Sequence, residues 1–264
     1  MYDFAYHKPK SVADAVALLK KSGEGKAVAG GMTLIPTLKQ RLARPSDVVD
    51  LNGVAELRGI KADGNGVTIG AMTRHAEVAS SADVKKTIPA LAGLAEHIGD
   101  NQVRNRGTIG GSVANSDPAA DYPAAVVALN ATIQTNERKI SADDFFKGMF
   151  ETALKDGELI TSVSFPKVEK AAYMKFPNPA SRYAMVGVFV AKTSSGVRVA
   201  VTGAGPSVFR VKAMEDALSK SFSADAIKDI KIPANGLNSD IHASAEYRAH
   251  LVNVMARRAV AAAG

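Results

Sequence analysis

Two pairs of adjacent glycines stand out as residues whose type and spacing could do chemistry. Gly30 and Gly31 lie in the stretch AVAGGMTLIP, and Gly110 and Gly111 lie in RNRGTIGGSVANSDPAAD. Because glycine has no Cβ atom, a glycine pair lets backbone N–H groups approach a ligand, and consecutive N–H groups that point one way bind anions. The two segments together predict a site that holds a ligand with two phosphates from both sides. The alternative is that each pair only forms a tight turn.

Short polar side chains accompany the second pair. Thr108, Ser112 and Asn115 can donate hydrogen bonds to phosphate oxygens. Further along, Asp121 can accept hydrogen bonds from the hydroxyls of a polyol or ribose. Neither segment has the Lys-Ser/Thr of a P-loop or the G-x-G-x-x-G of a dinucleotide-binding fold. Both of those nucleotide sites are therefore disfavoured.

The first glycine pair lies in a small predicted α/β lobe, residues 1–52. A helix is expected across SVADAVALLKKSG, with Ser11 as its N-cap and Gly23 at its end. The stretch KAVAGG predicts a strand that runs into the glycine pair, and a helix follows across TLIPTLKQRLA, with Leu42 facing inward and Pro45 ending it. DVVDL predicts another strand. A phosphate beside the start of the second helix would be favoured by the helix dipole.

The second pair lies in a predicted α+β lobe, residues 53–167. Hairpins are expected across LRGIKADGNGVTIGAM and between TIQT and KIS, and helices across TRHAEVAS, IPALAGLAEHIG and YPAAVVALNA. Residues 168–264 predict a separate domain. It begins with the hairpin MVGVFVAKTSSGVRVAVTGAG and carries helices at VKAMEDALSK, SADAIKDI and SAEYRAHLVNVMARRAVAAA.

Composition excludes several functions. The 264 residues include no cysteine, which excludes disulfides, iron–sulfur ligation and a cysteine nucleophile within this chain. The formal charge of +7 is spread along the chain, without tryptophan, so no nucleic acid is expected as a partner. The five histidines lack metal-ligand spacing, and we expect surface or helix-end positions for them. No signal peptide or membrane span is expected, and the predicted location is the cytoplasm.

The glycine segments and their surroundings resemble one family. AGGMTLIP and VRNRGTIGGSVANSDPAADYPA are similar to segments of the FAD-binding medium subunits of molybdenum hydroxylases, the family of aerobic carbon monoxide dehydrogenase and xanthine dehydrogenase. The resemblance extends, in the expected order, to FAYHKPKSVADAVALL, DVVDL, VTIGAMT, GELITSVSFP and FPNPASRYAMVGV. It implies an α+β fold: a two-lobed FAD-binding domain of the vanillyl-alcohol oxidase (PCMH) type, followed by an α+β C-terminal domain of antiparallel strands and helices.

The resemblance also implies FAD as the cofactor. The residues that it places around the pyrophosphate are Ala29, Gly30, Gly31, Met32 and Thr33 from one lobe and Thr108, Ile109, Gly110, Gly111 and Ser112 from the other. Asn115 and Asp121 match positions that contact phosphate and sugar hydroxyls. Ile98 and Ile160 match positions that line the flavin, or alternatively are core residues. Lys175 matches a basic residue near the ring and Tyr183 a residue over one ring face, or both are surface groups.

The function implied by the resemblance is electron transfer within an oxidoreductase. Substrate would be oxidised at a molybdenum centre in a large subunit, electrons would pass through the [2Fe–2S] clusters of a small subunit, and the FAD of this chain would deliver them to an acceptor. The assembly would be a dimer of heterotrimers. Two other hypotheses remain at this point: a self-sufficient FAD-dependent oxidase or dehydrogenase of a small organic substrate, and a flavin-free interaction module.

Overall fold

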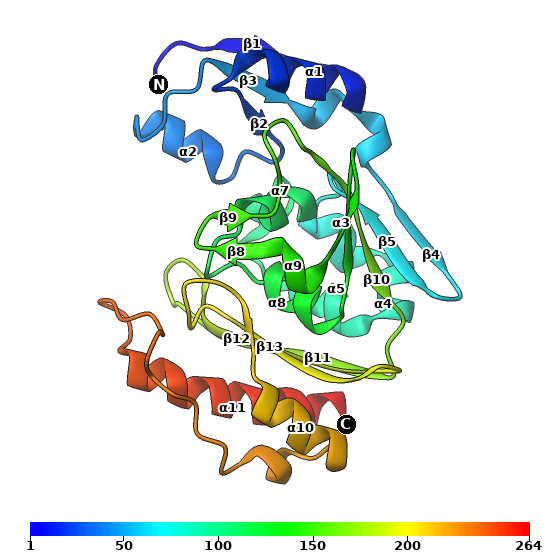
Figure 1. The fold of residues 1–264 in the computed structure, drawn as a ribbon, viewed down its shortest axis with the longest axis vertical. Coiled ribbons are helices and arrows are strands. Elements are labelled where there is room, and N and C mark those ends of the chain that lie inside the picture. Colours follow the sequence, from blue (N-terminus) through cyan, green and yellow to red (C-terminus); the bar gives the residue numbers. More distant parts are fainter.

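The computed structural model describes residues 1–264 and arranges them in three layers along the long axis (Figure 1). A small N-terminal lobe lies at one end, and a helix-rich lobe around a five-stranded sheet lies in the middle. A four-stranded sheet covered by helices forms the other end. The α+β architecture agrees with the predicted fold class.

The N-terminal lobe is built on a three-stranded parallel sheet with the order β1-β3-β2. Its elements are β1 (Ala5–His7), α1 (Val12–Ser22), β2 (Lys26–Val28), α2 (Leu34–Lys39) and β3 (Asp47–Asp50). The predicted limits of α1 are confirmed. The Ser11 side chain accepts a hydrogen bond from the N–H of Asp14, and Gly23 ends the helix at φ 66°.

The second helix of this lobe is shorter than predicted. α2 ends at Lys39, because Arg41 adopts a left-handed φ of 59° and the N–H of Leu42 returns to the carbonyl of Thr37. The chain turns away here, well before Pro45. Leu42 is therefore 74% exposed rather than facing inward, and Leu38 supplies the buried contact of the helix.

The middle lobe surrounds an antiparallel sheet with the order β4-β5-β10-β6-β7. The strands are β4 (Ile60–Asp63), β5 (Gly66–Gly70), β6 (Thr132–Thr135), β7 (Lys139–Ser141) and β10 (Ile160–Pro166). Both predicted hairpins are confirmed. A separate two-stranded hairpin consists of β8 (Phe146–Gly148) and β9 (Glu151–Thr152).

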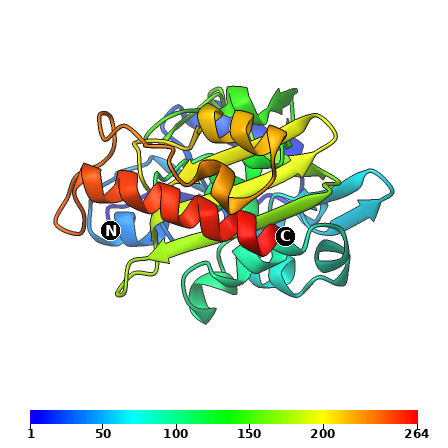
Figure 2. The ribbon, with the colours of Figure 1, turned by 90° about the horizontal axis from the view of Figure 1, so that it is seen from below.

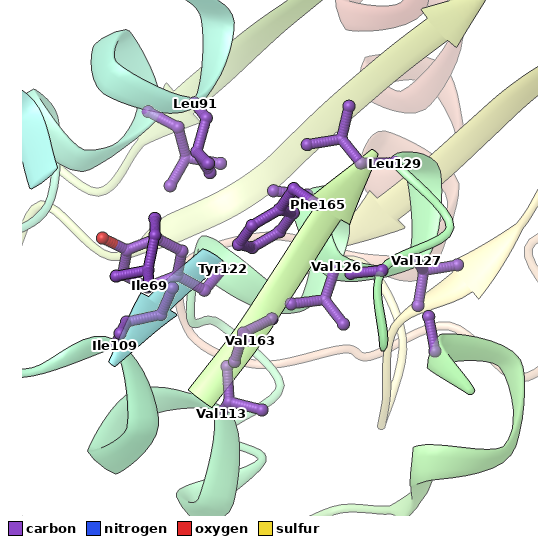
Figure 3. Close-up of a cluster of buried hydrophobic side chains, with 14 of the residues drawn as sticks. Ile69, Leu91, Ile109, Val113, Tyr122, Val126, Val127, Leu129, Val163 and Phe165 are labelled. Carbon is purple, nitrogen blue, oxygen red and sulfur yellow. The ribbon is translucent and has the colours of Figure 1, made fainter. Parts of the chain in front are cut away.

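Short helices pack on this sheet. They are α3 (His75–Ser80), α4 (Ala82–Thr87), α5 (Pro89–Glu96), α6 (Asn101–Arg104), α7 (Ile109–Asn115), α8 (Tyr122–Ala128) and α9 (Ala142–Phe145). The stretches of α4 and α6 were not predicted to be helical. The largest buried cluster of the molecule lies between helices and sheet, where Figure 3 shows Tyr122 and Ile109 beside the side chains of Ile69, Val163 and Phe165. All of α8 is buried, so this helix is the centre of the middle lobe.

The C-terminal part is an antiparallel sheet with the order β11-β12-β13-β14, made of β11 (Lys170–Pro177), β12 (Ala184–Thr193), β13 (Gly196–Thr202) and β14 (Phe209–Arg210). The helices α10 (Lys212–Lys220) and α11 (Ala245–Ala263) cover its outer face (Figure 2). The helix expected at SADAIKDI is only a 3₁₀ turn, Ala224–Ile227. Helices α5 and α8 contact the inner face, so β12 and β13 are buried on both sides and read as continuous apolar runs.

Direct hydrogen bonds join the C-terminal sheet to the middle lobe. The hydroxyl of Thr202 donates to the carbonyls of Pro118 and Ala120 at 3.0 and 2.6 Å. The N–H of Gly203 also donates to the carbonyl of Pro118, at 2.7 Å. The buried side chain of Arg198 donates to the carbonyl of Val127 at 2.8 Å. These contacts fix β13 against α8 and the segment that leads into it. No helix of the chain is both long enough and apolar enough to cross a membrane.

Candidate functional site

The first glycine segment, residues 29–33, connects β2 to α2. Gly31 has a φ of 75°, in the left-handed region that glycine tolerates. None of the backbone N–H groups of residues 29–33 donates a hydrogen bond to another atom of the protein. Buried backbone N–H groups are almost always paired, so the free donors at the buried Gly30 and the half-buried Ala29 and Gly31 are the strongest ligand-binding feature of this lobe.

The sequence predicts that the backbone N–H groups of the second glycine pair bind a ligand, and the structure corrects this. Gly110 and Gly111 form the first turn of α7, whose N-cap is Thr108. Their N–H groups already have acceptors: that of Gly110 donates to the carbonyl of Ala71 at 2.9 Å, and that of Gly111 to the Thr108 hydroxyl at 3.2 Å. The N–H of Ile109 is likewise bonded, to the carbonyl of Thr73. This segment therefore offers a close backbone approach at a helix N-terminus rather than a set of free donors.

The two glycine segments meet, as the sequence predicts. A Cβ atom added at Gly30 would lie 2.2 Å from the carbonyl oxygen of Arg106 and 2.7 Å from the Cα of Gly107. One added at Gly111 would lie 3.4 Å from the Cβ of Ala29. Residues almost 80 positions apart are thus in van der Waals contact only because glycines stand on both sides. The free N–H groups of the first segment lie beside the start of α7.

Two polar side chains on α7 complete this part of the site. Ser112 and Asn115 are three residues apart, so they share one face of the helix. Both are half-buried, and neither side chain has a hydrogen-bond partner within the protein. Beyond them, Ser116 ends the helix with a left-handed φ of 46°, and its hydroxyl donates to the carbonyl of Gly148. Free donors on backbone and side chains together fit a pyrophosphate.

Asp121 already has partners within the protein. It is 4% exposed, and its carboxylate accepts a hydrogen bond from the Tyr173 hydroxyl at 2.5 Å. The ammonium of Lys175 lies 3.0 Å from one carboxylate oxygen and 3.1 Å from the other. Burial raises the pKa of Asp121, against the opposing effects of Lys175 and Tyr173. A carboxylate can accept about four hydrogen bonds, so Asp121 keeps capacity for a ligand hydroxyl, but its main partners are two residues of β11.

The remaining predicted ring residues separate into two groups. Lys175 also donates to the carbonyl of His97 at 3.0 Å, which places it beside Ile98, and its side chain is only 6% exposed. Tyr183 is 47% exposed, and its partial burial together with the charges of Asp117 and Asp121 raises its pKa. These residues gather around Asp121. Ile160 is 5% exposed and belongs to the hydrophobic core of the middle lobe.

Two neighbours of the site were not singled out from the sequence. Tyr173 could have been found, because in an extended strand KAAYMKFP it shares a face with Lys175. His75 is at the start of α3, as predicted for a helix-end histidine, but it is buried rather than at the surface. It belongs to the segment 71–75, which pairs with residues 107–110. No local pattern signals that pairing, because it joins two irregular segments.

Known proteins share both the sequence and the fold. Residues 2–168 match the family model "FAD binding domain in molybdopterin dehydrogenase", and residues 171–263 match "CO dehydrogenase flavoprotein C-terminal domain". The chain is 36% identical to the glyceraldehyde dehydrogenase medium chain of Sulfolobus acidocaldarius, over 97% of both proteins. It is 37% identical to the nicotine 6-hydroxylase medium subunit of Paenarthrobacter nicotinovorans, over 98% of this chain and 96% of that subunit.

Among solved structures, a chain of carbon monoxide dehydrogenase from Hydrogenophaga pseudoflava superposes with a TM-score of 0.90 at 37% identity, covering 99% of this chain and 97% of that one. A chain of quinoline 2-oxidoreductase from Pseudomonas putida superposes with a TM-score of 0.90 at 29% identity. The expected family, cofactor and fold are thus confirmed, and the flavin-free module is excluded. The chain belongs to the family of FAD-binding medium subunits of molybdenum hydroxylases.

Proposed function

We propose that the pyrophosphate of FAD binds between residues 29–33 and the start of α7. The observation that carries this proposal is the run of free backbone N–H groups in residues 29–33, packed against Gly111. Ala29, Gly30, Gly31, Met32 and Thr33 would supply these donors. Ser112 and Asn115 would add side-chain donors from α7. The second glycine pair contributes by having no side chain where the ligand and the first segment approach.

The rest of the cofactor would then extend toward Asp121. In this arrangement Asp121 holds a sugar or polyol hydroxyl, Lys175 provides a cation near the ring, and Tyr183 covers a ring face. Ile98 is half-buried beside Lys175 and fits a ring-lining role. Ile160 would contribute only from the core behind the site, because its side chain is almost fully buried.

The cofactor supplies the redox chemistry when bound, and the chain supplies binding and electrostatics. Lys175 is suited to stabilise negative charge on a reduced ring, because a buried cation acts strongly on nearby charge. No cysteine is available to hold an iron–sulfur cluster in this chain, so a cluster that delivers electrons to the FAD would belong to another chain. The matched proteins are described as medium chains or subunits, which supports a role inside a larger complex.

We therefore infer that the chain transfers electrons from the [2Fe–2S] clusters of a small subunit, through FAD, to an acceptor. A large molybdenum subunit would oxidise the substrate, and the assembly would be a dimer of heterotrimers. The lobe limits 1–52, 53–167 and 168–264 and the cytoplasmic location remain predictions. A self-sufficient oxidase is disfavoured, because the chain aligns over 97–98% of its residues with proteins that are described as medium chains.

Purification of the tagged chain from its native source tests this function. We expect yellow material that contains FAD, a cysteine-rich chain with [2Fe–2S] absorbance and a large chain with molybdenum, in equal amounts. Mass spectrometry, metal analysis and the visible spectrum report all three components. A flavin-bearing chain that purifies alone and oxidises a small substrate by itself would contradict the proposed role.

A further inference from the structure

His75 lies beneath the point where the two glycine segments meet. Its backbone N–H donates to the carbonyl of Gly107 at 3.0 Å, and the residue is only 4% exposed. A Cβ atom added at Gly107 would lie 2.5 Å from Nε2 of His75 and 2.8 Å from Cδ2. The imidazole ring therefore rests directly on the main chain of Gly107.

Gly107 also contacts the first glycine segment. A Cβ atom added at Gly30 would lie 2.7 Å from the Cα of Gly107. The backbone of Gly107 is thus in contact with both the ring of His75 and the backbone of Gly30.

The same ring packs on Tyr122, the first residue of α8. The ring centroids of His75 and Tyr122 are 5.4 Å apart, with the planes inclined by 49°. The Nδ1 atom of His75 and the hydroxyl of Tyr122 are both buried without a hydrogen-bond partner. Unpaired buried polar atoms lower stability, so efficient core packing does not explain a histidine at this position.

The ring acts here through its shape rather than as a cation. Burial, together with the charge of Arg104, lowers the pKa of His75 to about 4, so the imidazole is neutral near pH 7. A neutral ring cannot attract phosphate by charge. The ring of His75 is therefore connected with the pyrophosphate site through its contact with Gly107.

We propose that His75 is a positioning residue for FAD: its ring holds Gly107 against Gly30 and so sets the spacing between residues 29–33 and α7. This inference rests on the proposed pyrophosphate site. It extends the functional set to a side chain that does not itself reach the cofactor. It also links α8, which follows Asp121, to the first glycine segment through packed groups.

Substitutions that move side-chain volume from His75 to Gly107 test the inference. Gly107→Ala adds a Cβ where the ring stands, and His75→Ala removes the ring; the double variant does both. The φ of Gly107 is not in the left-handed region, so alanine meets no conformational barrier there. The nearest other atom to the added Cβ is the carbonyl oxygen of Val103, at 3.1 Å, which requires a shift of only a few tenths of an ångström. His250→Ala, at an exposed position on α11, is the matched histidine control.

FAD affinity, measured by titration of the flavin-depleted chain, is the main readout. We expect Gly107→Ala to weaken binding more than about thirtyfold, and His75→Ala about three- to tenfold. The double variant should bind within about threefold of His75→Ala, and so more tightly than Gly107→Ala. The visible circular dichroism of the bound flavin should change in His75→Ala. It should stay changed in the double variant, which also lacks the ring. His250→Ala should bind like the unaltered chain.

Three results would overturn the inference. They are unchanged affinity in Gly107→Ala, no rescue in the double variant, or a lower melting temperature of His75→Ala with unchanged FAD affinity and spectrum. If Gly107→Ala does not fold, His75→Ala and the double variant still decide. Gly111→Val separates this from the proposed site, because its added atoms would meet the Thr108 hydroxyl and Ala29. Normal FAD binding by Gly111→Val would refute the site itself. If Gly111→Val loses FAD binding but His75→Ala does not rescue Gly107→Ala, only the role of His75 is refuted.

Discussion

Gly30→Ala is expected to abolish FAD retention. The added Cβ would lie 2.2 Å from the carbonyl oxygen of Arg106 and 2.7 Å from the Cα of Gly107, and both are backbone atoms that cannot rotate away. The two segments must then separate, which misplaces the free N–H groups of residues 29–33. Overpacking of this kind costs about 1–3 kcal/mol of stability. We expect the loss in FAD affinity to exceed about a hundredfold, which corresponds to about 2.8 kcal/mol.

Flavin content after purification, FAD titration and thermal unfolding check this result. Gly93→Ala is the matched control, because a Cβ at Gly93 in α5 meets no atom within 4 Å. Alanine is also the better helix former, so this variant should be as stable as the unaltered chain or slightly more so. An unaltered FAD affinity in Gly30→Ala would show that contact between the two segments is not required for binding.

Asp121→Ala is expected to reduce the stability of the chain even without FAD. The substitution leaves the ammonium of Lys175 without its carboxylate, in a position where the side chain is only 6% exposed. It also removes the acceptor of the Tyr173 hydroxyl. Breaking a buried ion pair from one side typically costs about 3–5 kcal/mol. Urea denaturation of the flavin-depleted protein measures this difference in the free energy of unfolding.

A double-mutant cycle with Lys175→Met isolates the ion pair. Methionine is similar in length to lysine and carries no charge, so the pair Asp121→Ala with Lys175→Met should recover most of the stability that Asp121→Ala loses. Lys192→Met, at a residue whose salt bridge to Glu169 is exposed, is the control and should change stability by less than about 1 kcal/mol. Strictly additive losses from the two buried positions would contradict the importance of the pair.

Much of the fold could be predicted because its signals are local. Ser11 and Gly23 bound α1 through capping chemistry that depends only on neighbouring residues. The turn between β4 and β5 contains an Asp-Gly-Asn-Gly stretch, which is a typical hairpin signal. The long apolar runs of β12 and β13 reflect burial on both faces. Each of these features follows from a few adjacent side chains.

The predicted and observed secondary structures differ where contacts with distant parts of the chain determine the local conformation. Leu42 looks like part of an apolar helix face, but the left-handed turn at Arg41 exposes it. Gly110 and Gly111 have low helix propensity, yet they form a helical turn because the carbonyl of Ala71 and the Thr108 hydroxyl accept their N–H groups. Such partners come from distant or irregular segments and leave no periodic signal.

The candidate site could be predicted only in outline, because its glycine segments are recognisable locally but its buried contacts are not. The first glycine pair indicates anion binding by its residue type, and the contact of the two segments through Gly30 follows if both serve one ligand. The burial of Asp121 with Tyr173 and Lys175 depends on the C-terminal sheet packing over α8, which no spacing within the chain encodes. The buried contact of His75 with Gly107 depends likewise on a long-range pairing.

Amide hydrogen exchange of residues 29–33, with and without FAD, tests the pyrophosphate site most directly. These N–H groups have no acceptor within the protein, so they should exchange rapidly in the flavin-depleted chain and become strongly protected when FAD binds. The N–H groups at the start of α7 already have acceptors and should change much less. Riboflavin, which lacks phosphate, should not protect residues 29–33. Exchange of these residues that stays fast at saturating, demonstrably bound FAD would contradict the account.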